Sequence, residues 1–180
     1  MSRPSIARAQ AGVLLGRGAY LHGAAFMGEG DRAGFLAGVS GAGKSTLLRQ
    51  LTKCGMRPIA DDAAIIFRNT KGRYLLRTAA DDLLHQQTGP AGILSALFFI
   101  EKGGTFHLEE LKMHYAYYRM IRDGMLWSDV YRYHADHGSH ARARADLFNI
   151  LRRTDCWALR YNASDPLSCQ HAVKAVGGMI

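Results

Sequence analysis

The sequence lacks the features that mark an exported or membrane-embedded protein. Its 180 residues include only three cysteines, at the scattered positions Cys54, Cys156 and Cys169. These thiols are too few for a disulfide framework or a zinc site, and free thiols are typical of a reducing cytoplasm. No run of about 18 apolar residues is present, so we expect no membrane-spanning segment and no membrane partner.

The first residues also lack the pattern of an export signal. Arg3 and Arg8 precede only a short apolar patch, which is too weak for a secretory signal. We therefore expect a cytoplasmic protein. No internal repeat, linker or low-complexity segment divides the chain, and its length suffices for one hydrophobic core. The sequence predicts a single domain over residues 1–180.

The chain is basic. The formal net charge is +8, and the cations are mostly arginine, whose planar fork suits phosphate and carboxylate groups. Zinc-finger spacing, an aromatic RNA-binding signature and a dense basic run are all missing, so a nucleic-acid partner is not expected. We interpret the charge as a solvated surface that tolerates anionic ligands. The sequence does not determine the oligomeric state, and a homo-oligomer is one of the alternatives.

Hydrophobic patterning predicts strands and helices in irregular alternation. The expected strands cover residues 19–28, 33–40, 56–62, 63–69, 74–78, 93–104 and 156–162. The expected helices cover residues 44–54, 79–87, 107–121, 143–153 and 165–176. Strand pairs near the start of the chain favour an α/β fold with a mixed sheet, an α+β sandwich, over a regularly wound parallel sheet.

Two of these predicted helices depend on particular residues. In the 107–121 segment, Leu108, Leu111, Tyr115 and Tyr118 recur at helical spacing, which predicts an amphipathic helix with these side chains on its apolar face. In the 79–87 segment, the pair Asp81 and Asp82 follows Thr78 in a capping arrangement. We therefore interpret this aspartate pair as structural.

The most specific signal is GVSGAGKS at residues 38–45, which matches the phosphate-loop pattern G-x-x-x-x-G-K-[ST] without deviation. From the composition of the chain, chance would produce only about 0.007 such matches. The motif also follows a predicted strand and opens a predicted helix. A glycine-rich turn that merely caps a helix would need neither the lysine nor three glycines.

Each position of this motif has a physical reason. Glycines let successive backbone N–H groups point at phosphate oxygens, and the helix N-terminus adds positive potential. Lys44 supplies a charge for the β- and γ-phosphates, and the Ser45 hydroxyl suits Mg²⁺. The predicted nucleotide-binding residues are Gly38, Ser40, Gly41, Ala42, Gly43, Lys44, Ser45 and Thr46.

Asp61 and Asp62 are the best-placed carboxylates for phosphate chemistry. The helix after the motif rises about 16 Å, and a strand of about five residues returns over about the same distance, so both aspartates come back to the level of the phosphates. Adjacent strand residues point to opposite faces, so both reach the site only if the strand ends or bends there. One aspartate would hold Mg²⁺, and the other would either act as the base or only cap a turn.

Residues 21–66 carry a histidine-glycine pair, a strand into the phosphate loop, a helix and an aspartate pair, in that order. This segment resembles the catalytic core of the bacterial HPr serine kinase/phosphorylase family, whose fold is shared with phosphoenolpyruvate carboxykinase. The resemblance implies that Ser45 and Asp62 hold Mg²⁺ and that Asp61 is the base for a serine hydroxyl. It places His22 near the phosphates, where the histidine either takes part in the site or supports the loop.

Other polar residues are less decisive. His134, His137 and His140 stand three apart, without the second ligand set that a metal site needs, so we interpret them as a polar loop. Arginines that could reach a phosphate or an acidic substrate group are Arg142, Arg144, Arg152 and Arg153.

The sequence thus predicts an ATP-dependent, Mg²⁺-requiring phosphotransferase. Its partners would be ATP and a small protein or peptide that carries the serine hydroxyl. The alternatives are a nucleotide-binding interaction module without catalysis and a kinase for a small metabolite. The phosphate donor is expected to be ATP, with pyrophosphate left open.

Overall fold

We describe the fold from a computed structural model, for residues 17–79, 90–123, 125 and 139–180. The strands are β1 (Gly18–His22), β2 (Ala24–Met27), β3 (Arg32–Ala37), β4 (Arg57–Ala60), β5 (Ala63–Arg68), β6 (Tyr74–Thr78), β7 (Gly92–Lys102), β8 (His107–Glu110) and β9 (Asp155–Tyr161). The helices are the short 3₁₀ helix η1 (Glu29–Asp31), α2 (Lys44–Lys53), α3 (Met113–Arg122), α5 (Ser139–Leu151) and α6 (Pro166–Met179).

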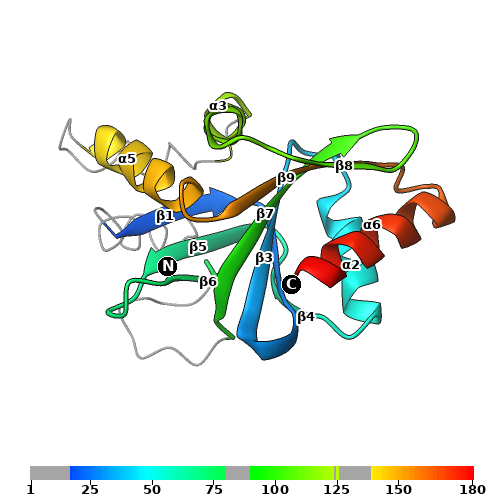
Figure 1. The fold of residues 1–180 in the computed structure, drawn as a ribbon, viewed down its shortest axis with the longest axis horizontal. Coiled ribbons are helices and arrows are strands. Elements are labelled where there is room, and N and C mark those ends of the chain that lie inside the picture. Colours follow the sequence, from blue (N-terminus) through cyan, green and yellow to red (C-terminus); the bar gives the residue numbers. More distant parts are fainter. Residues whose placement is uncertain (1–16, 80–89, 124, 126–138) are drawn as a thin grey trace, which may run out of the picture.

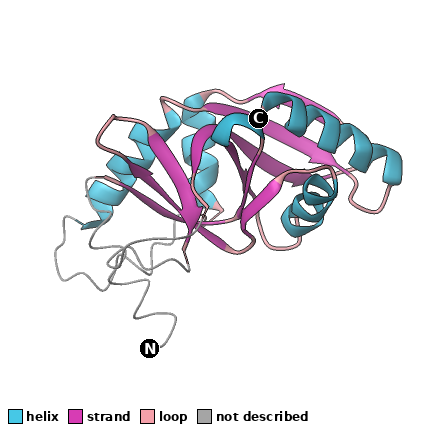
Figure 2. Cartoon of the chain, turned by 90° about the horizontal axis from the view of Figure 1, so that it is seen from below, coloured by secondary structure: helices cyan, strands magenta, loops and turns pink. Residues whose placement is uncertain are grey.

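The nine described strands form one mixed sheet with helices on both sides (Figures 1 and 2). Its main path runs β1-β5-β6-β7-β3-β2-β4, and β9 joins it beside β7 with β8 at its outer edge. The β7 strand pairs in parallel with β3 and with β9, whereas the β2–β3, β5–β6 and β8–β9 pairs are antiparallel. The prediction of a mixed sheet is confirmed.

The β7 strand is central because its side chains are apolar on both faces. Leu97 and Phe99 pack into a core cluster with α3 and α5, whereas Phe98 and Ile100 pack into a second cluster with α2 and α6. A continuous apolar run is typical of a parallel strand that is covered on both sides. Burial of each phenylalanine contributes about 1.5–3 kcal/mol, so the two clusters hold the helices on opposite faces of the sheet.

Three parallel strands end at the same edge of the sheet, which we call the carboxyl edge. The β3 strand ends at Ala37, β7 at Lys102 and β9 at Tyr161. The β4 strand runs in the same direction as β3, since both are antiparallel to β2, and it ends at Ala60. Side chains that follow these four strands are therefore brought to one edge, where open α/β sheets bind ligands.

One predicted strand is two strands in the structure. Residues 19–28 divide at Gly23, where pairing changes from β5 to β3 and β4. A Cβ atom on Gly23 would lie 2.3 Å from the ring of Phe35, so only glycine fits there. The break matters for the site because it leaves His22 at the end of β1, near the carboxyl edge.

The predicted helix over residues 107–121 is wrong in its first part. Residues 107–110 form β8, which pairs with β9, and the helix α3 begins only at Met113. Its apolar face is also different, since Ala116 and Met120 are buried whereas Tyr115 and Tyr118 are more than half exposed. Pairing with the open edge of β9 overrides the helical spacing of the leucines.

Most other boundaries agree with the prediction to within a few residues. The predicted 56–62 strand is shorter, α5 begins before its predicted start and ends at Leu151, before its predicted end, and α6 continues beyond its predicted end. The predicted 79–87 helix, with Asp81 and Asp82, lies largely outside the described residues, as do His134 and His137. Among the described residues, no helix is long and apolar enough to cross a membrane.

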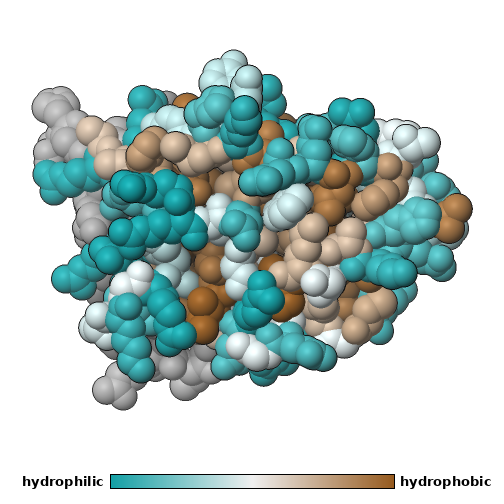
Figure 3. All heavy atoms as spheres, in the orientation of Figure 1, coloured by the Kyte–Doolittle hydropathy of each residue, from teal (hydrophilic) through white to brown (hydrophobic). Residues whose placement is uncertain are grey.

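The surface is divided between hydrophilic and hydrophobic areas. In Figure 3, hydrophilic side chains cover most of the left side of the displayed face, whereas hydrophobic and intermediate residues gather around α6 on the right.

The last turn of α6 is held by a hydrogen bond from β3. Arg32 Nη2 donates this 2.9 Å hydrogen bond to the carbonyl oxygen of Met179. The helix α6 is therefore fixed against the β2–β3 hairpin at its far end.

Candidate functional site

The glycine-rich loop, residues 38–43, joins β3 to α2 at the carboxyl edge. Gly41 and Gly43 have φ angles of +77° and +105°, in the left-handed region that glycine favours. Gly43 directly precedes α2, so its backbone turns the chain into the helix. The predicted arrangement of strand, loop and helix is thus present, with Ser40 and Gly41 exposed, Ala42 buried, and Ser45 and Thr46 half-buried in the first turn.

The Lys44 side chain folds back over this loop. Its Nζ donates hydrogen bonds of 2.6 Å to the Gly38 carbonyl and 3.0 Å to the Val39 carbonyl, and the residue is only 7% exposed. Burial lowers the pKa of the Lys44 ammonium, and the charges of Asp62 and Asp61 act against this effect. The loop therefore holds a cation at its centre, within electrostatic influence of two carboxylates.

Asp61 and Asp62 lie where the chain leaves β4. The strand ends at Ala60, and both aspartates occupy a bend and are exposed. The condition for both to reach the site was that the strand ends or bends at this point, and the structure meets it. Because both charges influence the pKa of Lys44, both carboxylates lie in the neighbourhood of the glycine-rich loop.

His22 belongs to the same group of residues. Its Nδ1 lies 3.4 Å from Oδ1 of Asp62, and the backbone N–H of Gly23 donates a 2.9 Å hydrogen bond to the Asp62 carbonyl. The backbone of His22 donates to the Met125 carbonyl at 2.8 Å. The β1–β2 junction thus fixes the Asp62 backbone and brings an imidazole to its carboxylate.

Tyr161, at the end of β9, supports the glycine-rich loop and was not among the predicted residues. Its hydroxyl donates a 2.8 Å hydrogen bond to the Gly43 carbonyl. Burial raises the pKa of this phenol well above its ordinary value, so the donor proton is retained. The only sequence signal was a tyrosine at the carboxyl end of a late strand, which does not indicate its partner.

A second unpredicted group lies at the end of β7. Glu101 accepts hydrogen bonds from Arg119 Nη1 at 2.7 Å and from Arg160 Nη2 at 3.0 Å. Burial opposes ionisation of Glu101, but Arg160 and Arg119 together outweigh it and lower its pKa. Two arginines are therefore held at the carboxyl edge, whereas the four predicted from sequence lie on α5 or just after it.

The oxygen donors beside the glycine-rich loop are of the kind that magnesium binds in proteins. Within the described part of the chain, no three His, Cys, Asp or Glu side chains form a complete metal site by themselves. Magnesium is usually held by one or two protein oxygens together with water and substrate phosphates. The Ser45 hydroxyl in the first turn of α2 and the exposed Asp62 carboxylate are oxygen donors of this kind, so the donor set suits Mg²⁺.

No family model matches this chain, and no curated protein matches it. Among solved structures, the chain is similar to the Hpr(Ser) kinase/phosphatase from Coxiella burnetii, with 7% sequence identity and a TM-score of 0.44. The alignment covers 88% of this chain and 89% of that protein. A likeness at this TM-score assigns neither a family nor an activity, which therefore have to be argued from the residues.

Proposed function

We propose that this protein is an ATP-dependent phosphotransferase that requires Mg²⁺ and phosphorylates a hydroxyl group, a serine on a small protein or peptide. The observation that supports it best is that Lys44, at the centre of the glycine-rich loop, lies within electrostatic influence of Asp61 and Asp62 at the carboxyl edge. A loop that only capped a helix would need no lysine at its centre and no carboxylates facing it. A phosphoryl-transfer site needs both, because a cation must offset phosphate charge and a base must take a proton.

Each residue has a role in the proposed reaction. The N–H groups of the glycine-rich loop and the Lys44 ammonium bind the triphosphate, after Lys44 leaves the Gly38 and Val39 carbonyls that it now contacts. The acceptor oxygen forms a bond to the γ-phosphorus, the bond from this phosphorus to the β–γ bridging oxygen breaks, and the acceptor proton moves to Asp61. Ser45 and Asp62 would hold Mg²⁺, and this ion would supply positive charge against the phosphates.

His22 acts through Asp62 in this proposal. Because its Nδ1 lies 3.4 Å from the Asp62 carboxylate, the imidazole orients the carboxylate that would hold the metal. This is the role of a group behind a metal ligand. His22 therefore positions Asp62 and does not itself accept the substrate proton.

Replacement of the proposed base tests this function. Asp61→Asn keeps the size of the side chain and removes its ability to take a proton. We expect ATP binding within about twofold of wild type and a loss of transfer of at least about 100-fold, in line with general-base catalysis. The measurement is transfer of labelled γ-phosphate to a library of serine-containing peptides. Asp155→Asn changes an exposed aspartate at the start of β9 and serves as the matched control.

The outcomes separate the candidate functions. Normal transfer by the Asp61→Asn chain would show that Asp61 is not the base. ATP binding by the wild-type chain without transfer to any peptide or metabolite would instead indicate a nucleotide-binding interaction module. That second function is favoured by one observation, the exposed aromatic side chains Tyr115, Tyr118 and Phe148 on the neighbouring helices α3 and α5.

A further inference from the structure

The loop between β9 and α6, residues 162–165, borders the glycine-rich loop. Tyr161, which directly precedes it, donates to the Gly43 carbonyl at 2.8 Å. A Cβ atom built on Gly43 would lie 3.6 Å from Cβ of Ala163. The 162–165 loop therefore lies beside the proposed phosphate site, although it is distant from the glycine-rich loop in the sequence.

This loop is held in place by its own hydrogen bonds. Oδ1 of Asn162 accepts from the N–H of Ser164 at 3.0 Å, and the N–H of Asn162 donates to Oγ of Ser168 at 3.0 Å. Asp165 caps α6 by accepting from the N–H groups of Leu167 and Ser168. Ala163 and Ser164 are left exposed, so a fixed loop presents small and polar groups beside the glycine-rich loop.

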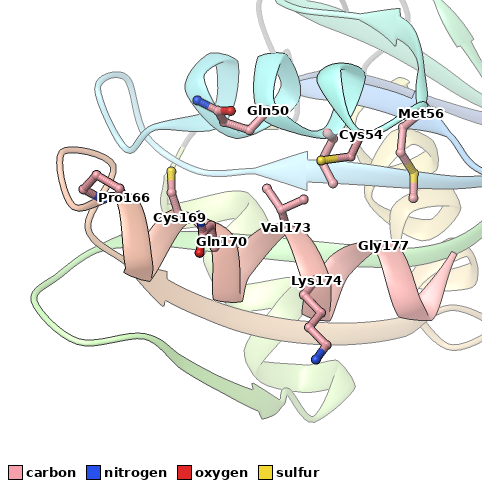
Figure 4. Close-up of a pocket in the computed structure, with 10 residues that line it drawn as sticks. Gln50, Cys54, Met56, Pro166, Cys169, Gln170, Val173, Lys174 and Gly177 are labelled. Atoms are coloured by element: carbon pink, nitrogen blue, oxygen red, sulfur yellow. The ribbon is translucent and has the colours of Figure 1, made fainter.

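A groove of about 650 Å³ runs between α2 and α6 next to this loop. Figure 4 shows Cys169 and Val173 of α6 pointing toward α2, with Cys54 and Met56 on the opposite wall. The polar residues Gln50, Gln170 and Lys174 also line it. The walls are thus mainly apolar with a few polar residues, which is typical of sites for small organic ligands.

The groove lies within reach of a nucleotide whose phosphates are on the glycine-rich loop. Gln50 follows Gly43 by seven residues, so it stands about 10 Å further along α2. Thr46, Gln50 and Cys54 are four residues apart and lie along one side of the helix. This stripe leads from the first turn of α2, where a phosphate would bind, to the wall of the groove.

We propose that the nucleoside end of the bound nucleotide lies on the 162–165 loop, with its base at the mouth of the α2–α6 groove. This inference rests on the proposed function, since it needs a triphosphate on the glycine-rich loop. A purine base suits this place because its faces are apolar and its edge pairs with amides such as those of Gln50 and Gln170. The protein would therefore recognise a nucleoside triphosphate, and not the phosphate chain alone.

Comparison of ATP with inorganic tripolyphosphate tests this proposal, because tripolyphosphate has the phosphates and lacks the nucleoside. We expect the wild-type chain to bind ATP at least about tenfold more tightly in calorimetry, since several contacts of about 1 kcal/mol each are added. Val173→Trp, which fills the groove, should weaken ATP binding about tenfold and leave tripolyphosphate binding within about twofold. Retained tripolyphosphate binding also shows that the variant is folded.

A second variant tests the loop. Asn162→Ala removes the acceptor that fixes Ser164 and should weaken ATP binding about fivefold without changing tripolyphosphate binding. Asn69→Ala is the matched control, because Asn69 Oδ1 accepts from the N–H of Arg73 at 2.9 Å in the turn between β5 and β6. That control should leave both affinities unchanged.

The possible results separate this inference from the proposed function. Equal affinity of the wild-type chain for ATP and tripolyphosphate would overturn the nucleoside site and leave the phosphotransferase proposal standing. If Val173→Trp and Asn162→Ala weakened the binding of ATP and of tripolyphosphate equally, the nucleoside site would also be overturned. These residues would then only support the glycine-rich loop. If the wild-type chain bound neither ligand, the proposed function itself would fall.

Discussion

The Tyr161 hydroxyl donates a hydrogen bond to the carbonyl oxygen of Gly43, at 2.8 Å, across the carboxyl edge of the sheet. The same carbonyl accepts the N–H of Leu47 at 2.9 Å, the first helical hydrogen bond of α2. Gly43 is thus tied both to its own helix and to the strand that leads into the 162–165 loop. The orientation of the glycine-rich loop therefore depends on β9 as well as on β3 and α2.

Removal of this hydroxyl tests that dependence. Tyr161→Phe should lower the free energy of unfolding by about 0.5–1.5 kcal/mol and weaken ATP binding severalfold, because Gly43 loses one of its two anchors. Urea unfolding and calorimetry measure the two effects. Tyr74→Phe on β6 is the control, since its side chain is half-buried away from the carboxyl edge. Unchanged ATP affinity in the Tyr161→Phe chain would show that the hydrogen bond only adds stability.

The two left-handed glycines of the loop should differ in their tolerance of a methyl group. A Cβ atom on Gly41 would meet nothing within 4 Å, whereas one on Gly43 would lie 2.8 Å from the Tyr161 hydroxyl. Gly41→Ala should therefore cost only backbone strain, about 1–2 kcal/mol. Gly43→Ala should cost more, because a steric clash is added to the strain.

A double-mutant cycle isolates the clash. If the clash with Oη is responsible, Gly43→Ala should destabilise the Tyr161→Phe chain less than it destabilises wild type, so the two free-energy changes will not add. Gly30→Ala is the control for strain alone, because Gly30 has a φ of +62° and open space around it in the β2–β3 turn. Simple additivity of the two changes would contradict this account.

The glycine-rich loop and the two aspartates could be predicted because their signals are local. The match of residues 38–45 needs no tertiary information, and the return of Asp61 and Asp62 follows from the rise of one helix and one strand. The structure adds that the strand ends at Ala60, so that both carboxylates come close enough to Lys44 to influence its pKa. The chemical role of each aspartate stays a prediction.

The features that the sequence did not reveal depend on distant pairing. The break at Gly23 arises from contact with Phe35 on another strand, and residues 107–110 form a strand because β9 offers a free edge. Tyr161 meets Gly43 across 118 positions, and Arg160 meets Glu101 across 59. Hydrophobic spacing carries no information about such partners.

The Glu101 carboxylate should make the stability of the protein depend on pH at acidic values. Arg160 and Arg119 lower its pKa against the opposing effect of burial. A lowered pKa in the folded state means that the stabilisation is present above the ordinary glutamate pKa, about 4.3, and is lost as the pH falls through the folded value. We expect the free energy of unfolding to fall in this acidic range.

Glu101→Gln should remove that part of the pH dependence and destabilise the protein at neutral pH. The loss should be about 1–3 kcal/mol, because Arg119, with a side chain only 14% exposed, loses its anionic partner. Urea unfolding at a series of pH values measures both effects. Glu110→Gln, which changes an exposed glutamate on β8, is the matched control. An unchanged acidic profile in the Glu101→Gln chain would show that other carboxylates dominate it.

The three cysteines should react at very different rates. Cys54 is exposed, whereas Cys156 and Cys169 are buried. Burial raises the pKa of Cys156 to about 12, with a smaller contribution from Asp155, and burial also raises the pKa of Cys169. Because the thiolate is the reactive form, a thiol reagent at pH 8 should modify one cysteine rapidly in the native protein and all three in urea. Cys54→Ser should abolish the rapid phase, and survival of that phase in this variant would place the reactive thiol elsewhere.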